Sequence, residues 1–117
     1  MIYTLGKRER LSSKKDIGRL LEKGHYGSVD GLKYCYAPAS GESVNRILVS
    51  VPKKLFRRAV KRNLLKRRLR ESYRLQKGLL EASGVDIMFI YASKEILPFS
   101  SISALVGDIL KEINSRL

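Results

Sequence analysis

Residues 52–74 read Pro52-Lys53-Lys54-Leu55-Phe56-Arg57-Arg58-Ala59-Val60-Lys61-Arg62-Asn63-Leu64-Leu65-Lys66-Arg67-Arg68-Leu69-Arg70-Glu71-Ser72-Tyr73-Arg74. From Lys53 onward this segment has eleven Lys and Arg residues against one acid, and so carries +10 of the formal net charge of +13. It lies between Pro52 and Gly78 with no other Pro or Gly, and most of its residues are good helix formers. The sequence therefore predicts a helix from about Leu55 to Gln76. Charges of one sign at this density repel one another unless a polyanion lies beside them.

A helical wheel of the predicted helix gathers its basic side chains on one face. At about 100° per residue, a single wedge holds Ala59, Arg62, Asn63, Lys66 and Arg70. Forked guanidinium groups match phosphate, and an Asn amide can contact a base edge or a sugar. We therefore predict a helix that lies on a sheet and presents a cationic stripe to a nucleic acid. A solvated basic face without a partner is the alternative interpretation.

The composition sets limits on the class of protein. A chain of 117 residues, 44% of them hydrophobic, indicates one folded domain over residues 1–117. A pI near 10.2 indicates a nucleic acid or an anionic membrane surface as partner. Because no apolar run reaches membrane-spanning length and the N-terminus lacks a signal-peptide hydrophobic region, we expect a cytoplasmic protein with no membrane partner. The single Cys35 cannot form an internal disulfide, and we expect it to be a buried free thiol.

The remaining segments predict an α+β fold, in which about three helices form one layer on a mixed sheet. Residues 1–11 are expected to be a flexible basic arm, and His25 an incidental loop residue. A turn over 38–43 suggests that the strands on either side of it pair as an antiparallel hairpin. The predicted elements besides the basic helix are a helix over 13–23, strands over 32–36, 46–51 and 85–91, and a last helix that opens at Pro98 to Ser101.

The sequence holds no recognisable set of catalytic residues. One Cys and one His exclude a zinc cluster, and no Gly-rich phosphate loop is present. The eleven acids are scattered singly, so they provide neither a carboxylate pair nor the grouped ligands that a protein nuclease uses for Mg²⁺. We therefore predict no catalytic residue and no metal ligand. If this protein belongs to an enzyme, the catalytic groups lie elsewhere.

The basic segment forms a long gapped motif that resembles a known signature. It comprises Lys53-Lys54, then Arg57 to Asn63, Lys66-Arg67 and Arg70-Glu71. It is similar to the RNR motif, with its Arg-Asn-x-x-Lys-Arg core, of the bacterial ribonuclease P protein subunit. The resemblance covers nearly the whole chain, because Arg10-Leu11, Gly24, Val49-Ser50 and the Asp-Ile-x-x-Ile pattern of Asp86–Ile90 fall where the family has them. It implies the two-layer fold of a ribosomal-protein domain, with the basic helix in a β-α-β crossover.

The resemblance also implies a function. The family's protein subunit assists a catalytic RNA in the Mg²⁺-dependent endonucleolytic removal of the 5′ leader from precursor tRNA. The Mg²⁺ would be held mainly by the RNA partner and the substrate, with one protein per RNA. The implied RNA-binding residues are Lys53, Lys54, Arg57, Arg58, Arg62, Asn63, Lys66, Arg67 and Arg70. The implied leader cleft, between the first helix and the sheet, is lined by Ile17, Leu21, Tyr34, Tyr36 and Ser50.

One departure from the family pattern bears on the leader cleft. The family often has aromatic residues where this chain has Ile17 and Leu21, so base stacking is expected to move to the tyrosines. An alternative function is that of a ribosomal or other structured-RNA-binding protein without a processing role. A DNA-binding regulator is disfavoured, because no helix-turn-helix arrangement and no zipper heptad accompany the basic helix.

Overall fold

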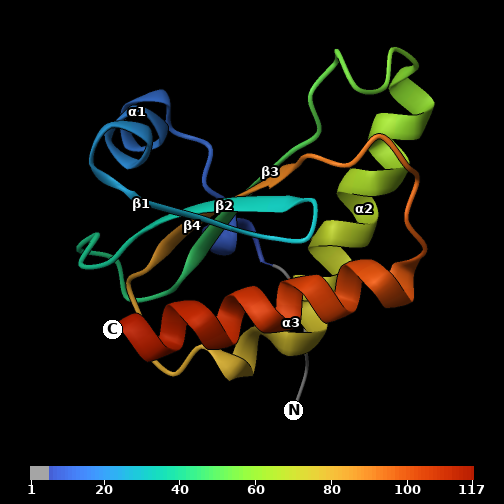
Figure 1. Cartoon of the computed structure of the whole chain (residues 1–117). Coiled ribbons are helices and arrows are strands. Elements are labelled where there is room, and N and C mark those ends of the chain that lie inside the picture. The colour runs from blue at the N-terminus through green and yellow to red at the C-terminus, as the bar shows by residue number, and fades with distance from the viewer. Residues whose placement is uncertain (1–5) are drawn as a thin grey trace.

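The computed structural model describes residues 6–117 and shows a four-stranded mixed sheet with helices on both faces (Figure 1). The elements follow in the order η1 (Lys7–Glu9), α1 (Lys14–Lys23), β1 (His25–Val29), β2 (Leu32–Ala37), β3 (Arg46–Ser50), α2 (Ala59–Gln76), η2 (Lys77–Leu79), β4 (Asp86–Tyr91) and α3 (Phe99–Arg116). The predicted α+β class, the mixed sheet and the three main helices are confirmed.

The strand order in the sheet is β1-β2-β4-β3. β2 runs antiparallel to both β1 and β4, whereas β3 runs parallel to β4, so α2 is the crossover that joins the parallel pair. The predicted hairpin between residues 32–36 and 46–51 is therefore wrong, because β4 lies between these strands. The nearly all-apolar sequence of β4 explains its place, since a strand covered on both faces belongs in the middle of a sheet.

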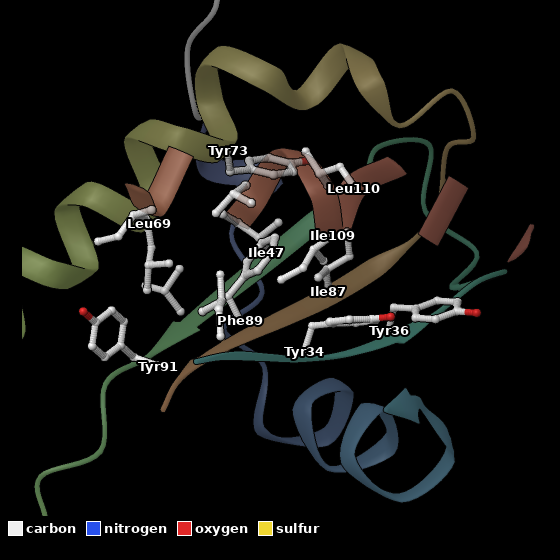
Figure 2. Close-up of a cluster of buried hydrophobic side chains, with 14 of the residues drawn as sticks. Tyr34, Tyr36, Ile47, Leu69, Tyr73, Ile87, Phe89, Tyr91, Ile109 and Leu110 are labelled. Carbon is white, nitrogen blue, oxygen red and sulfur yellow. The ribbon is translucent and has the colours of Figure 1, made fainter. Parts of the chain in front are cut away.

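The two faces of the sheet are covered differently. Alternate side chains, among them Tyr34, Ile47 and Phe89, point toward α2 and α3 and form the main core (Figure 2). α1 lies on the opposite face, over a smaller cluster built around Leu20 and Cys35. The prediction places all helices in one layer, whereas in the structure α2 and α3 cover one face of the sheet and α1 lies on the other. Cys35 is the buried free thiol that the sequence predicts, and its Sγ lies 3.4 Å from the carbonyl oxygen of Leu20.

α2 begins four residues later than predicted, at Ala59 instead of Leu55. The carbonyl oxygen of Pro52 accepts hydrogen bonds from the N–H groups of Leu55 and Phe56, at 3.1 and 3.4 Å, which closes a turn. Phe56 is buried, and Arg58 is extended at the N-cap with φ −78° and ψ 124°. Residues 53–58 therefore form a loop ahead of α2, and the first four basic residues of the motif lie on this loop.

The N-terminal segment is ordered where the structure describes it. The arm predicted over 1–11 falls partly on residues 1–5, which lie outside the described residues. Residues 6–11 do not form a flexible arm, because the N–H of Leu11 donates to the carbonyl oxygen of Ile47 at 2.8 Å and Leu11 is buried. Glu9 Oε1 also accepts from Lys77 Nζ at 2.8 Å. The segment is thus held along the outer edge of β3, next to the end of α2.

β1 is absent from the prediction, in which His25 is a loop residue. His25 in fact begins this strand, and its ring lies 5.2 Å from that of Tyr36. Gly27 and Ser28 are weak strand formers, which hides the strand from a propensity argument. Gly27 is nevertheless needed here, because a Cβ at this position would collide with the hydroxyl end of the buried Tyr34 side chain.

Candidate nucleic-acid interface

The basic loop and α2 together form one surface rich in positive charge. We call it the cationic surface, and it consists of the nine residues for which RNA binding is predicted above. The exposed members are Lys53, Lys54, Arg57 and Arg58 on the loop and Asn63, Arg67 and Arg70 on the helix. Opposite them, Leu65, Leu69 and Tyr73 are buried in the main core. Within residues 6–117, no ion pair joins any residue of the cationic surface to an acid. The helix is thus anchored by its apolar side and leaves its positive charge uncompensated.

The start of α2 adds to this charge. Its first turn contains no acid, the N-cap is Arg58, and basic residues lie before and after it, at Arg57 and Lys61. A positive side chain near the positive end of the helix dipole is unfavourable by about 0.3–1 kcal/mol when exposed. An anion bound there would be attracted both by the helix dipole and by these side chains. The junction between loop and helix therefore favours a negatively charged partner.

Arg62 does not project in the way that the helical wheel predicts. Its Nη1 donates to the carbonyl oxygens of Phe56 and Arg57, at 2.8 and 2.7 Å, and the side chain is half-buried. Arg62 thus fixes the loop against the first turn of α2 and so positions Arg57. Lys66 is also half-buried, whereas Arg67 lies fully on the exposed side. The centre of the exposed side is therefore rotated from the predicted stripe toward Arg67.

The α1 side of the sheet is only partly covered, and we call it the open face. Of the predicted leader residues, Ile17 packs beside Leu48 and Met88, and Leu21 is 41% exposed on the last turn of α1. Ser50 is half-buried and lies two residues after Leu48 on β3, so the two side chains point to the same face of the sheet. Three of the five predicted leader residues therefore lie on the α1 side.

Tyr34 and Tyr36 lie on the other face, so their predicted place in the leader cleft is wrong. They are 0% and 4% exposed and belong to the main core under α3 (Figure 2). Tyr34 Oη donates to Glu112 Oε1 at 2.6 Å. Burial and this hydrogen bond raise the pKa of Tyr34 to about 12. The predicted alternation is correct, but it is Cys35, between the two tyrosines, that faces α1.

Tyr26 is the aromatic side chain that the prediction missed. It pairs with Cys35 across β1 and β2, and directly paired residues share a face, so Tyr26 lies on the α1 side. Tyr26 is 56% exposed, and its Oη donates to the carbonyl oxygen of Leu21 at 2.7 Å. The sequence offers no clear signal for β1, and it is the pairing with β2 that places Tyr26 on the side of α1.

A buried ion pair fixes the start of α1 to the sheet. Arg46 forms a forked pair with Asp86, with both distances 2.9 Å, and also donates to Asp16 at 3.1 Å. Asp86 is 3% exposed, and its hydrogen bonds raise the pKa of Arg46. Among residues 6–117, no three His, Cys, Asp or Glu side chains are grouped so that they could hold a metal ion. Over the same range, no helix is both long and apolar enough to cross a bilayer.

The fold agrees with a comparison to known proteins. The family model for ribonuclease P matches residues 5–114. The chain belongs to the ribonuclease P protein family. The ribonuclease P protein component of Borrelia turicatae is 30% identical over 107 residues, which cover 91% of this chain and 92% of that protein.

Two further ribonuclease P proteins are similar to this chain. The protein component of Porphyromonas gingivalis is 45% identical over 80 residues, which cover 67% of this chain. This alignment spans 58% of the Porphyromonas protein. A solved structure of a Staphylococcus aureus RNase P protein mutant, described as having defective mRNA degradation activity, superposes with a TM-score of 0.79. It is 27% identical, and the match covers 92% of this chain and 89% of that one.

Proposed function

We propose that this chain is the protein subunit of ribonuclease P and assists a catalytic RNA in removing the 5′ leader of precursor tRNA. The observation that carries the proposal is the cationic surface, whose members have no acidic partner within residues 6–117 while the other side of α2 is buried. Membership of the ribonuclease P family supplies the identity of the RNA. The same comparisons do not favour a ribosomal role.

The cationic surface would bind the catalytic RNA mainly through its phosphates. Arg57 and Arg58 on the loop and Arg67 on α2 present forked donors, which match phosphate oxygens. Asn63 is exposed and uncharged, so its amide would contribute geometry without charge. Arg62 would act indirectly, because its bonds to the loop hold Arg57 in place. Each neutralised phosphate releases counterions, so the affinity should fall steeply with salt.

The open face would hold the single-stranded leader. Ile17, Leu21 and Met88 leave apolar surface partly accessible there, and Ser50 adds a hydroxyl at the end of β3. Tyr26 supplies an exposed ring, and bases of single-stranded RNA stack on aromatic side chains. The proposal thus moves the stacking role from Tyr34 and Tyr36 to Tyr26.

The reaction would require Mg²⁺, which we assign to the catalytic RNA and the substrate, as the family resemblance implies. The described side chains do not fit a resident Mg²⁺ site, because no three His, Cys, Asp or Glu side chains among residues 6–117 are grouped so that they could hold a metal ion. The contribution of the chain is positive charge that offsets the repulsion between two RNAs. The active site would accordingly lie in the RNA, with one protein per RNA, and the complex would work in the cytoplasm.

Reconstitution tests the proposal. The protein is added to the ribonuclease P RNA of the same organism at low Mg²⁺, and cleavage of precursor tRNA is followed. We expect the protein to stimulate cleavage, and rigorously RNA-free protein to cleave neither precursor tRNA nor mRNA. The mRNA is included because the Staphylococcus mutant is described by a defect in mRNA degradation. Cleavage by the protein alone, or no stimulation of the RNA, would contradict the proposal; co-sedimentation with a ribosomal subunit would support the ribosomal alternative.

A further inference from the structure

Two arginines from distant parts of the sequence face one pocket at the outer edge of β3. The pocket has a volume of about 190 Å³ and is lined by Arg10 and Ser12 from the N-terminal segment, by residues 47–49 of β3 and by Arg70 of α2. No acid lines it. Arg70 belongs to the cationic surface, whereas Arg10 lies on a segment that the sequence assigns to a flexible arm.

The main chain around Arg10 is held on both sides. On one side, Glu9 accepts from Lys77 Nζ at 2.8 Å and, through its second carboxylate oxygen, from the N–H of Gly6 at 3.0 Å. On the other, the N–H of Leu11 donates to the carbonyl oxygen of Ile47 at 2.8 Å. Arg10 itself forms a parallel bridge with Ile47. The segment therefore holds Arg10 at the same pocket as Arg70 before any ligand arrives.

Neither guanidinium is compensated. Both side chains are exposed, and within residues 6–117 neither Arg10 nor Arg70 has a side-chain hydrogen bond or an ion pair. Two positive groups beside one pocket repel each other, and an anion between them converts this repulsion into attraction. A phosphate has oxygens enough to accept a forked pair of hydrogen bonds from each guanidinium.

The main chain of β3 also bears on the pocket. The N–H of Arg46 points to β4, where it donates to the carbonyl oxygen of Val85 at 3.0 Å. Because the direction alternates along a strand, Ile47 and Val49 turn their N–H groups to the outer edge. The carbonyl oxygen of Ile47 accepts from the N–H of Leu11, and Ile47 and Val49 are both among the residues that line the pocket.

We propose that Arg10 and Arg70 together bind one phosphate group of the backbone of the catalytic RNA. The RNA interface would then extend from α2 across the edge of β3 to the N-terminal segment. This inference rests on the proposed function for the source of the phosphate. It adds Arg10 to the RNA-binding residues and gives a function to the ordered N-terminal segment.

The test compares Arg10→Gln, Arg70→Gln and the double variant with wild type. The dissociation constant for the ribonuclease P RNA is measured over a series of salt concentrations. Each single change should weaken binding roughly tenfold, as expected for the loss of a charged hydrogen bond. If both arginines hold the same phosphate, the double variant should lose less than the product of the two single losses. For this variant, the slope of log affinity against log salt concentration should become shallower by somewhat under one unit, which corresponds to the loss of one phosphate contact and not of two.

Two controls match these variants. Arg8→Gln makes the same charge change two residues away, outside the pocket, where the guanidinium donates to Ser43 Oγ at 2.8 Å. It should change the affinity by less than about twofold, since surface changes away from specific contacts have small effects. Arg10→Lys keeps the charge and removes the fork, and should give an intermediate affinity with the slope unchanged. Melting temperatures confirm that each variant is folded.

The outcomes separate this inference from the proposed function. Arg67→Gln, on the cationic surface but outside the pocket, reports on the proposed function. Weaker binding by Arg67→Gln with no effect of Arg10→Gln would overturn the phosphate site and leave the proposed function standing. Equal losses for Arg10→Gln and Arg8→Gln, or a double variant whose slope falls by two contacts, would also overturn the site. Absence of RNA binding by the wild-type protein would overturn both.

Discussion

The two faces of the sheet differ most clearly along β4, where neighbouring residues have opposite environments. Ile87 and Phe89 are 0% exposed under α2 and α3, whereas Met88 and Ile90 point to the other face of the sheet and are half-buried. We call the face under α2 and α3 the closed face. It carries most of the hydrophobic stabilisation, which scales with the apolar area removed from water. This concentration lets the open face keep accessible apolar surface. A single strand thus contributes to stability with one set of residues and to the candidate leader site with the other.

The largest effect should come from a cavity in the closed face. Phe89→Ala removes a fully buried ring that lies against Tyr73, and should destabilise the fold by about 3–5 kcal/mol. Met88→Ala, one residue away on the open face, should have a cost of about 1 kcal/mol, which is ordinary for a point mutation. Urea unfolding of both variants measures the difference. Similar losses for the two would show that the faces share the stabilisation evenly.

The second effect tests how α1 is held on the open face. Asp86→Ala leaves Arg46, which is itself mostly buried, without its forked partner. The expected loss is about 3 kcal/mol, at the low end for a broken buried pair, because Asp16 remains within 3.1 Å of Arg46. The matched control is Arg116→Gln, which removes the solvent-accessible pair with Glu112 while Glu112 still accepts from Tyr34, and should have a cost of less than about 1 kcal/mol. Thermal unfolding and urea titration apply to both variants. If Asp86→Ala is as mild as the control, apolar contacts alone hold α1.

The third effect concerns the ring on the open face. Tyr26→Ala should weaken binding of leader-bearing tRNA by about 1–3 kcal/mol, the usual contribution of stacking one base on an aromatic ring. Tyr26→Phe keeps the ring and removes the hydroxyl that donates to the carbonyl oxygen of Leu21, so it should retain most of the affinity. Mature tRNA, which has no leader, should bind both variants like wild type. Equal losses for leader-bearing and mature tRNA would remove Tyr26 from the leader site.

The elements of the fold follow from the sequence more readily than their arrangement. Periodicity and capping predict α1, α3 and β4, and the basic charge predicts the surface of α2, because these signals are local. The face on which Tyr34 lies is not local, since it depends on which helices cover which side of β2. The position of β4 between β2 and β3 depends on how the crossover returns the chain to the sheet, so local sequence patterns do not predict it either. A helical wheel also cannot predict the hydrogen bond from Arg62 to the carbonyl oxygen of Phe56, because the wheel treats Phe56 as part of the helix.

The smallest effect returns to the tyrosine that the sequence assigns to the wrong face. Tyr34→Phe removes the hydrogen bond to Glu112 and should destabilise the fold by roughly 1 kcal/mol, while leader binding stays unchanged. Because the pKa of Tyr34 is raised from 10 to about 12 in the folded state, its neutral form contributes stability that is complete below pH 10. That contribution is lost as the pH rises from about 10 to about 12. Urea titrations at several pH values across this window should therefore show a smaller decline for Tyr34→Phe than for wild type. A parallel decline, together with weaker leader binding by Tyr34→Phe, would return Tyr34 to the leader site and contradict the division between the two faces.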